Sequence, residues 1–479
     1  MPELDKKSGI WKRYLFGALI VIVAAAAATS VTAFNEVDTL SRAFGGQLFL
    51  GGDLAEAPPG KPQTVLLIGS DKRARTARDA QLGSGARSDT MILMRLDPEK
   101  KVIALLSLPR DLKVHIPGHG VDKLNAAYAE GGTRLTLRTI KELTGLAINH
   151  VVNVDFRGFR DAVDAIHCVY VDVDRRYFND NSNPNDQYAT IDIDPGYQKL
   201  CGQDALDYVR YRHTDSDIVR AARQQDFLRE AKQQISAKRL FDDQDKLVRI
   251  IGHYTRSDIH GRKDVLTLIK LALGSLGSPI REIHFPAHVG ASYVTARAAA
   301  VRKVTREFLG VQASRGPRGP SRPRSSRAHH HHSSAGLIDI SAAGRTQALK
   351  VAGGVRGMLI YYPRRALQGD SFSINSPRAY KICGPHARCW ASYRMVVSRD
   401  LVGEYWGLQG TKWTDPPILQ SPDATKTIDH RKFYLFYDGH RLRLVAWREK
   451  DAVYWVSNTL LETISNRQMM DLARAAKPL

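Results

Sequence analysis

Apolar and polar residues alternate along most of the chain with two different periods. Short apolar runs bounded by polar residues predict strands at 64–69, 91–96, 102–108, 150–155 and 168–174. Apolar positions recur at helical spacing over 133–145, 156–166 and 217–235. Because strands alternate with helices, the pattern predicts an α/β fold with a central sheet from Gln63 to about Gly310.

After residue 336 the pattern becomes β-rich. Residues 433–447 predict a hairpin with Asp438-Gly439 as its turn, followed by a strand at 452–461 and a helix at 465–476. We find no catalytic constellation in this region. Burial in a small core is the prediction for Trp406, Trp413 and Trp455, and stacking on sugars is the alternative.

One segment is apolar without either period. Residues 14–35 carry no charge, and a membrane-spanning helix needs about 20 predominantly apolar residues. The lysines and arginine just before it keep residues 1–13 in the cytoplasm by the positive-inside rule. A single-pass signal anchor is therefore predicted. A cleaved signal peptide is the alternative, and both place the bulk of the chain outside the cytosol.

Composition divides the chain after residue 35 into a stalk, two domains and a linker. A Gly- and Pro-containing stalk is predicted at 36–61, a catalytic domain at 62–310 and a smaller accessory domain at 337–479. Residues 311–336 form a basic low-complexity linker whose four consecutive histidines are read as a solvated tract rather than a metal site. The formal net charge of +21 implies an anionic partner, but the extracytoplasmic placement argues against nucleic acid.

Acidic and basic residues gather at the ends of the predicted strands. Asp71 and Arg73 follow the first strand, Arg87 and Asp89 precede the second, and Arg110 follows the third. In open α/β sheets ligands bind where such loops converge. Two carboxylates delivered there can share one Mg²⁺, which prefers oxygen ligands and a substrate phosphate. The alternative is that both aspartates are turn residues paired with their neighbours.

A fourth group is rich in arginine. Arg210 and Arg212 stand two apart and share a side only if that stretch is extended. Arg220 and Gln224 lie four apart on the following helix and share a face. Arginine forks bind phosphate oxygens bidentately, so these residues match a diphosphate.

A solvated basic helix is the alternative, and it accounts for Arg223 and Arg229 better than for the arginine pair before the helix. An anion site beside two acids suggests metal-assisted phosphoryl transfer.

The motifs that contain these residues occur in one order along the chain, and in that order residues 61–310 resemble the LytR-CpsA-Psr family. The resemblance rests on LLIGSDKR, RSDT, SLPRDLKVHIPGHGVDKLNAAYAEGG, LTGLAINHVVNVDFRGF and GQDALDYVRYRHTDSDIVRAARQQDFL. It implies an α-β-α sandwich with a central mixed sheet. It also implies a membrane-anchored bacterial phosphotransferase, which moves a glycopolymer from a polyprenyl-pyrophosphate carrier in an apolar tunnel onto peptidoglycan.

The resemblance also implies roles for individual residues. The implied catalytic residues are Asp71, Asp89, Arg110, Arg210 and Arg212, and the two aspartates would hold Mg²⁺ or Mn²⁺. The implied pyrophosphate-binding residues are Arg73, Arg87, Lys123, Arg220 and Gln224. The implied partners are the lipid-linked glycan, peptidoglycan and membrane lipid.

Four cysteines are too few for a disulfide scaffold, but an extracytoplasmic chain can form disulfides. Cys383 and Cys389 could close a small loop, and buried free thiols are the alternative; a zinc site is disfavoured because no CxxC pair is present. The family usually has Gly-Gly-Val at 167–169 and an aliphatic residue near Cys201. The paired departure favours a Cys168–Cys201 disulfide.

Two other functions remain open at this point. A hydrolase would release phosphate from polyprenyl pyrophosphate with water as acceptor, and would keep turning over when the glycan acceptor is left out. A non-catalytic, membrane-anchored protein that binds wall polymer would show no magnesium-dependent product. The sequence does not identify the polymer, the accepting sugar or the oligomeric state.

Overall fold

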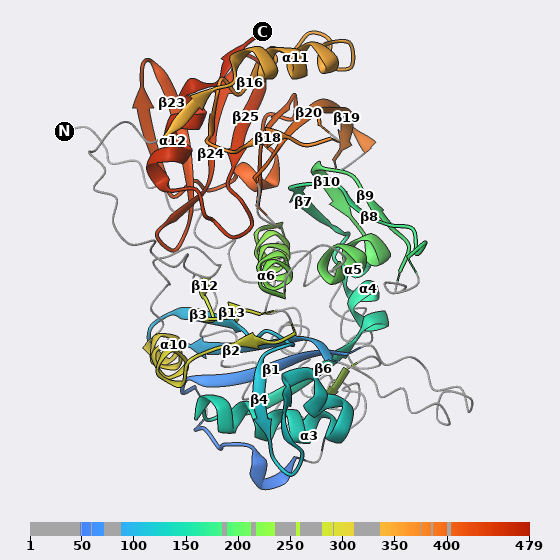
Figure 1. Ribbon diagram of the computed structural model, residues 1–479, viewed down its shortest axis with the longest axis vertical. Helices are drawn as coiled ribbons and strands as arrows, with labels where there is room; N and C mark the ends of the chain where they lie inside the picture. The colour runs from blue at the N-terminus through green and yellow to red at the C-terminus, as the bar shows by residue number, and fades with distance from the viewer. Residues whose placement is uncertain are drawn as a thin grey trace, which may run out of the picture. The chain divides into compact units, whose positions relative to one another are not determined.

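The computed structural model describes residues 48, 50–58, 60–70, 88–183, 189–211, 217–234, 255–258, 280–290, 292–310, 336–374, 376–384, 387–399 and 404–479 (Figure 1). They fall into two compact units. The first takes in the chain up to residue 169 together with 201–206 and 227–313, and the second takes in 170–200, 207–226 and 314–479.

A six-stranded sheet forms the centre of the first unit. Its strands, in spatial order, are β11 (Thr255–Ser257), β6 (His150–Asp155), β1 (Gln63–Ser70), β2 (Ser88–Asp97), β3 (Val102–Ser107) and β12 (Ile280–Ile283). β1 runs parallel to β6 and β3 parallel to β12, and the other neighbours are antiparallel. Every residue of β3 is buried, as expected where a sheet is covered on both faces. The predicted α/β fold with a mixed central sheet is confirmed.

Two helices pack together against this sheet (Figure 1). α3 (Leu124–Thr144) contacts β2, and α10 (Ala298–Gly310) contacts α3, β3 and β12. α3 begins nine residues earlier than the predicted 133, because its first part is joined to the rest across a non-helical break at Gly131 and Gly132. The helix ends at Gly145, whose left-handed φ of 67° is the conformation that glycine favours.

The remaining elements of the first unit are short. α4 (Phe156–Ala165) begins where the Asp155 side chain accepts a hydrogen bond from the Gly158 N–H at 2.8 Å. The others are η1 (Gly51–Asp53), the hairpin β4 (Lys113–Ile116) and β5 (Gly120–Lys123), and the pair β13 (His288–Val289) and β14 (Val294–Thr295). α5 (Gly202–Arg210) and α6 (Asp217–Gln234) contribute residues to both units.

An antiparallel eight-stranded sheet dominates the second unit. Its path is β18 (Ser371–Phe372), β20 (Cys389–Ser398), β21 (Tyr405–Thr411), β25 (Ala452–Ser457), β24 (Arg441–Glu449), β23 (Arg431–Asp438) and β22 (Ala424–Ile428), with β19 (Arg378–Cys383) also paired to β20. The C-terminal region is β-rich, as predicted. The predicted turn is one residue off: Asp438 pairs with Arg441, so the two-residue turn is Gly439-His440.

Helices and short strands complete this unit. α12 (Asn466–Ala475) begins at a capping box between Ser465 and Gln468. The others are α11 (Ser341–Ala352), η4 (Pro417–Leu419), β15 (Leu337–Asp339), β16 (Tyr361–Tyr362), β17 (Arg365–Leu367), β26 (Lys477–Pro478), β7 (Val169–Val173), β8 (Tyr177–Asn179), β9 (Ile191–Ile193) and β10 (Gly196–Leu200).

The C-terminal sheet shares a hydrophobic core with β7 and β10. Tyr170 and Tyr197 belong to one buried cluster with residues such as Trp455. Beside this cluster the Asp172 carboxylate pairs with the fully buried Arg394 at 3.1 Å and accepts a hydrogen bond from the Trp455 indole N–H at 3.2 Å. This ion pair joins β7 to β20 beside the shared core.

The predicted cytoplasmic tail and membrane helix, and most of the two predicted connecting segments, fall outside the described residues. These are 1–13, 14–35, most of the stalk and most of the linker. Among the residues that the structure does describe, no helix combines the length and the apolar character needed to span a bilayer.

Candidate functional site

Three neighbouring strands of the first unit end or begin at one edge of the sheet. Ser70, the last residue of β1, pairs with Ser88 at the start of β2 and with Asp155 at the end of β6. The register shifts at this point and passes over Asp89, which forms a β-bulge. Bulges are common beside active sites, where they redirect a side chain. The edge is therefore irregular where the sequence predicts a carboxylate.

The predicted acids start from neighbouring points on this edge. Asp71 follows Ser70 directly, and Asp89 follows Ser88, the residue with which Ser70 pairs. Asp71, Arg73 and Arg87 themselves lie outside the described residues, and the structure describes Asp89 only as part of the β2 backbone.

A buried polar network supports the end of β1 from behind. The Ser70 hydroxyl donates to Asn153 Oδ1 at 2.9 Å, and Asn153 Nδ2 donates to the Tyr128 hydroxyl at 2.7 Å and to Thr133 Oγ1 at 3.1 Å. These four residues are all buried. Buried polar groups with satisfied hydrogen bonds fix a unique geometry. The network therefore holds β1, β6 and α3 together at the edge.

Arg110 and Lys123 lie at the same end of the sheet. Arg110 follows β3, and its Nε stands 3.6 Å from Asp111 Oδ2, while Lys123 Nζ stands 3.3 Å from Asp111 Oδ1. The Arg110 carbonyl also accepts from the backbone N–H of Asn125, in the first turn of α3, at 2.9 Å. Lys123 immediately precedes that helix, where the helix dipole favours anions. Both cations therefore lie beside the Asp111 carboxylate, near the start of α3.

Three further predicted ligands of the phosphates, Arg210, Arg220 and Gln224, belong to the second unit. Arg220 and Gln224 are buried on α6, and the Gln224 side chain donates to the Val209 carbonyl at 3.1 Å. Arg210 and Arg212 would share a side only if the chain were extended there. Arg210 is instead the last residue of the helix α5. Arg212 lies outside the described residues.

Arg223 is not the solvated residue that the sequence suggested. It is fully buried, and its Nη1 donates to the carbonyls of Tyr208 and Tyr211 at 2.8 and 2.9 Å. Its guanidinium lies 4.5 Å from the centroid of the Tyr177 ring. The Tyr177 hydroxyl donates to Asp174 at 2.5 Å, and burial raises the pKa of that carboxyl. Arg229 likewise forms an ion pair, with Glu282.

Both predicted cysteine pairs form disulfides, Cys168–Cys201 and Cys383–Cys389. Asp164 lies beside the first pair, but its carboxylate accepts from the Gly202 N–H at 2.8 Å and the sulfurs are bonded to each other, so this group is not a metal site. His167 and Cys168 have φ values of 65° and 68°, the left-handed region that glycine favours.

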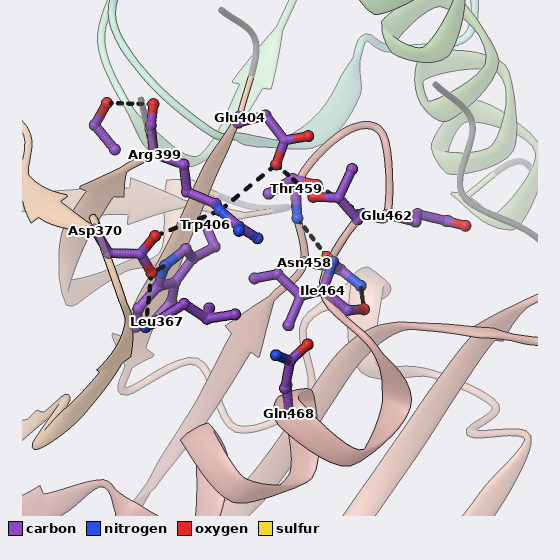
Figure 2. Close-up of polar contacts among 12 residues, drawn as sticks. Leu367, Asp370, Arg399, Glu404, Trp406, Asn458, Thr459, Glu462, Ile464 and Gln468 are labelled. Atoms are coloured by element: carbon purple, nitrogen blue, oxygen red, sulfur yellow. Dashed lines mark hydrogen bonds and ion pairs between the residues drawn. The ribbon is translucent and has the colours of Figure 1, made fainter. Parts of the chain in front are cut away.

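The tryptophans of the C-terminal sheet divide into two groups. Trp406 and Trp455 are fully buried, as predicted, whereas Trp413 is half-buried. Figure 2 shows that the Trp406 indole points to Asp370, to which it donates at 2.8 Å, and that Arg399 lies between Asp370 and Glu404. This buried cluster is structural. A fourth tryptophan, Trp390, is also half-buried. It is not among the tryptophans named above, because the burial of an isolated aromatic residue cannot be predicted from the sequence.

Comparisons with known proteins agree on one family. Residues 26–307 match the LytR_cpsA_psr family, which is more than half of the 479-residue chain. Polyisoprenyl-teichoic acid--peptidoglycan teichoic acid transferase TagT of Bacillus subtilis (strain 168) is 33% identical over 223 residues, which cover 46% of this chain and 68% of TagT.

Two further relatives match over similar ranges. Polyisoprenyl-teichoic acid--peptidoglycan teichoic acid transferase TagU of Oceanobacillus iheyensis is 32% identical over 203 residues, covering 41% of this chain and 58% of TagU. A solved structure of the LytR-CPS2A-psr family protein YwtF (TagT) with bound octaprenyl pyrophosphate lipid is 27% identical, covers 56% of this chain and 96% of that chain, and superimposes with a TM-score of 0.37.

Proposed function

Because the chain belongs to the LytR_cpsA_psr family, we propose that it transfers a glycopolymer phosphate from a polyprenyl-pyrophosphate carrier to a sugar hydroxyl of peptidoglycan. The hydroxyl oxygen forms a new bond to the glycan-bearing phosphorus, and the bond from that phosphorus to the bridging oxygen breaks. Polyprenyl phosphate leaves, and the hydroxyl proton passes to a base. The names of the relatives TagT and TagU support this class of reaction.

One observation carries the proposal: the register at the sheet edge. Ser70, the residue before Asp71, pairs with Ser88, the residue before Asp89. Arg110 follows β3 at the same end of the sheet and shares the Asp111 carboxylate with Lys123. Phosphoryl transfer depends mainly on positioning and on neutralising charge, rather than on covalent participation by the protein. Two acids together with these two cations would be suited to that task.

Arginine and lysine side chains would bind the phosphates. Arg110 and Lys123 present their cations at the first turn of α3, and the guanidinium fork suits two phosphate oxygens at once. The family resemblance assigns the same task to Arg73, Arg87, Arg210, Arg212, Arg220 and Gln224. These donors would stabilise the negative charge that develops on the leaving polyprenyl phosphate.

The two aspartates fit a divalent cation. Two such carboxylates would provide the oxygen ligands that Mg²⁺ or Mn²⁺ takes, with positions left for water and substrate phosphate. A bound Mg²⁺ would supply charge neutralisation. An aspartate that is not committed to the metal would accept the proton of the sugar hydroxyl.

The proposed location is the outer side of a bacterial cytoplasmic membrane, with residues 14–35 as a single-pass anchor. The absence of charge in that segment supports the anchor, and the lysines and arginine before it support a cytoplasmic N-terminus. The two disulfides also support an extracytoplasmic placement, since such bonds persist in oxidising compartments.

Reconstitution tests the proposal. The purified full-length chain in detergent is given a lipid-linked glycan and peptidoglycan fragments, with and without Mg²⁺, and the conjugate is measured by mass spectrometry. We expect conjugate only when both Mg²⁺ and acceptor are present. Release of phosphate that continues undiminished without acceptor would instead identify a hydrolase, and no product under any condition would identify a binding protein.

A further inference from the structure

A pocket of about 430 Å³ lies in the second unit, on the C-terminal sheet. Its wall comes from the loop before β20, the segment after β21 and the turn between β24 and β25. This volume lies within the range of small-molecule sites, roughly 300–1,000 Å³. The side chains that matter for the argument are Arg388, Trp390, Lys412, Trp413, Asp415 and Asp451.

Two stacked tryptophans form its apolar part. The rings of Trp390 and Trp413 have their centroids 4.7 Å apart and are inclined by 7°. Trp413 packs against the buried cluster below and meets the edge of Tyr170 at 5.1 Å. Trp390 stacks on Trp413 and lines the pocket while remaining half-buried. The second indole therefore adds apolar surface to the wall of the pocket.

Backbone constraints hold Trp390 in this position. Its ring lies against Gly384, where a Cβ would stand 2.6 Å from Trp390 Cζ3, so glycine permits the approach. The Cys383–Cys389 disulfide closes the loop between β19 and β20, and Trp390 follows directly after Cys389. A ring that is already ordered loses little conformational entropy when it binds a ligand.

Charged groups in opposite-sign pairs surround the tryptophans. Lys412 Nζ lies 3.2 Å from Asp451 and lowers the pKa of that carboxyl, and Arg448 Nη2 lies 3.8 Å from Asp415. Arg388 places its guanidinium 5.4 Å from the Trp390 centroid. Paired cations and carboxylates offer both donors and acceptors with little net charge. Sugar hydroxyls, which donate and accept, match such a rim better than phosphates do.

We propose that this pocket is a saccharide-binding site for a cell-wall glycan chain. The apolar face of a pyranose ring would pack on the Trp390 indole, and its hydroxyls would bond to Lys412, Asp451 and Asp415. The choice of a cell-wall glycan rests on the proposed function, but none of the residues that line the pocket is assigned to the transfer reaction. A peptidoglycan glycan strand and a wall polymer present the same chemistry and are distinguished by the experiment.

Binding to the full-length chain in detergent tests this site. Co-sedimentation with insoluble peptidoglycan sacculi forms one arm. Calorimetric titration forms two more, with soluble glycan strands and with lipid-free wall polymer. We expect wild type to bind one of the two glycans and Trp390→Ala to bind it at least tenfold more weakly. Asp451→Ala should weaken it severalfold, and Trp390→Phe should retain most of the affinity because it keeps an aromatic face.

Tyr437→Ala is the matched control. Tyr437 is a half-buried aromatic residue on β23 of the same sheet and does not line the pocket, so its replacement should leave binding unchanged. Equal affinity of Trp390→Ala, Asp451→Ala and wild type would overturn the proposal, as would a wild-type chain that binds neither glycan. If Trp390→Ala proves unstable in thermal unfolding, Asp451→Ala and Trp390→Phe decide the matter.

Discussion

Arg223 shows how far a single residue can depart from its sequence pattern. A basic residue on a basic helix is predicted to face solvent. Arg223 is instead fully buried among Tyr177, Tyr208 and Tyr211. Its environment comes from β8 and the end of α5, which the helix sequence does not reveal. A buried guanidinium whose donors reach backbone carbonyls fixes the path of the chain around it.

Arg223→Lys should therefore destabilise the protein. The ammonium cannot reproduce a guanidinium fork that reaches two carbonyls, and hydrogen bonds from charged donors contribute roughly 1.5–3 kcal/mol each. We expect a loss of about 2 kcal/mol or more in the free energy of unfolding, measured in urea. Arg302→Lys, on the exposed face of α10, is the control and should change stability by less than about 0.5 kcal/mol. Equal stability of the two variants would contradict this role.

Lys232 predicts a pH dependence. Burial, with a smaller contribution from Arg229, lowers its pKa to about 7, whereas an unfolded lysine has a pKa of about 10.4. Between these values the unfolded chain holds a proton that the native chain has released. Stability from this residue therefore rises with pH through that window, by up to about 1.4 kcal/mol per pH unit. It is lost as pH falls through the same window, down to the native pKa of about 7.

Urea unfolding of Lys232→Met between pH 7 and 9.5 checks this expectation. The variant should be more stable than wild type at pH 7, and its stability should rise less steeply with pH. Lys303→Met removes an exposed lysine of α10 and should keep the wild-type slope. An unchanged slope in Lys232→Met would show that Lys232 is protonated in the native state throughout this range.

The sequence predicts the positions of residues at strand ends but not those of residues that are placed by long-range packing. Asp89 and Arg110 stand at strand ends, and strand ends follow from apolar periodicity. Trp390 acquires its role only through Gly384 and Trp413, which different strands bring to it. Long-range packing of this kind leaves no periodic trace in one sequence.

At the scale of elements, the first disulfide joins the start of β7 to the start of α5. Cys168 and Cys201 are 33 residues apart, and the backbone at His167 and Cys168 is held in the left-handed region. The covalent link restricts the unfolded chain and offsets the cost of two non-glycine residues in that conformation.

Replacing both cysteines by serine should cost roughly 3–4 kcal/mol for a closed loop of this length. Thermal unfolding of Cys168→Ser/Cys201→Ser against the Cys383→Ser/Cys389→Ser variant provides the comparison. The second pair closes a loop with a separation of only 6 residues and should cost less. A smaller loss for the first pair than for the second would contradict the loop-length argument.

Element boundaries follow the sequence where a local signal exists. β1, β3 and β6 match their apolar runs within a residue, and α12 begins at its Ser465 cap. β2 begins at Ser88, before its apolar run, and therefore includes Asp89, which was predicted to precede it. The β23–β24 turn shifted by one residue because Asp438 pairs in the ladder. α3 includes an earlier helical segment that a non-helical break at Gly131 and Gly132 separates from the predicted helix. The apolar pattern therefore predicts the boundaries of elements least accurately at turns and at breaks within helices.

At the scale of the whole chain, residues far apart in sequence share one core. Tyr170 and Tyr197 pack with Ile382 and Trp455, and Asp172 pairs with Arg394. The sequence places the linker between these groups and gives no sign that they meet. The C-terminal sheet thus completes the packing around β7 and β10.

A chain that ends at residue 310 should therefore be destabilised. Removing the C-terminal sheet would expose Tyr170 and Tyr197, each now almost fully buried. We expect a lower unfolding temperature and increased binding of a hydrophobic dye, relative to the full chain. Full-length Asp172→Asn, which loses the ion pair but keeps the core, should fall between them. Unfolding of the truncated chain at the full-length temperature would contradict the shared core.

The central claim is that Asp71 and Asp89 hold one cation at the sheet edge. The most direct measurement is a double-mutant cycle on conjugate formation at varied Mg²⁺, using Asp71→Asn, Asp89→Asn and the double variant. We predict that each single change lowers the rate by about 100-fold or more and that the double variant is no slower than the slower single variant, because the residues act as one unit. Rate losses that multiply, or an unchanged Mg²⁺ requirement in both single variants, would contradict the claim.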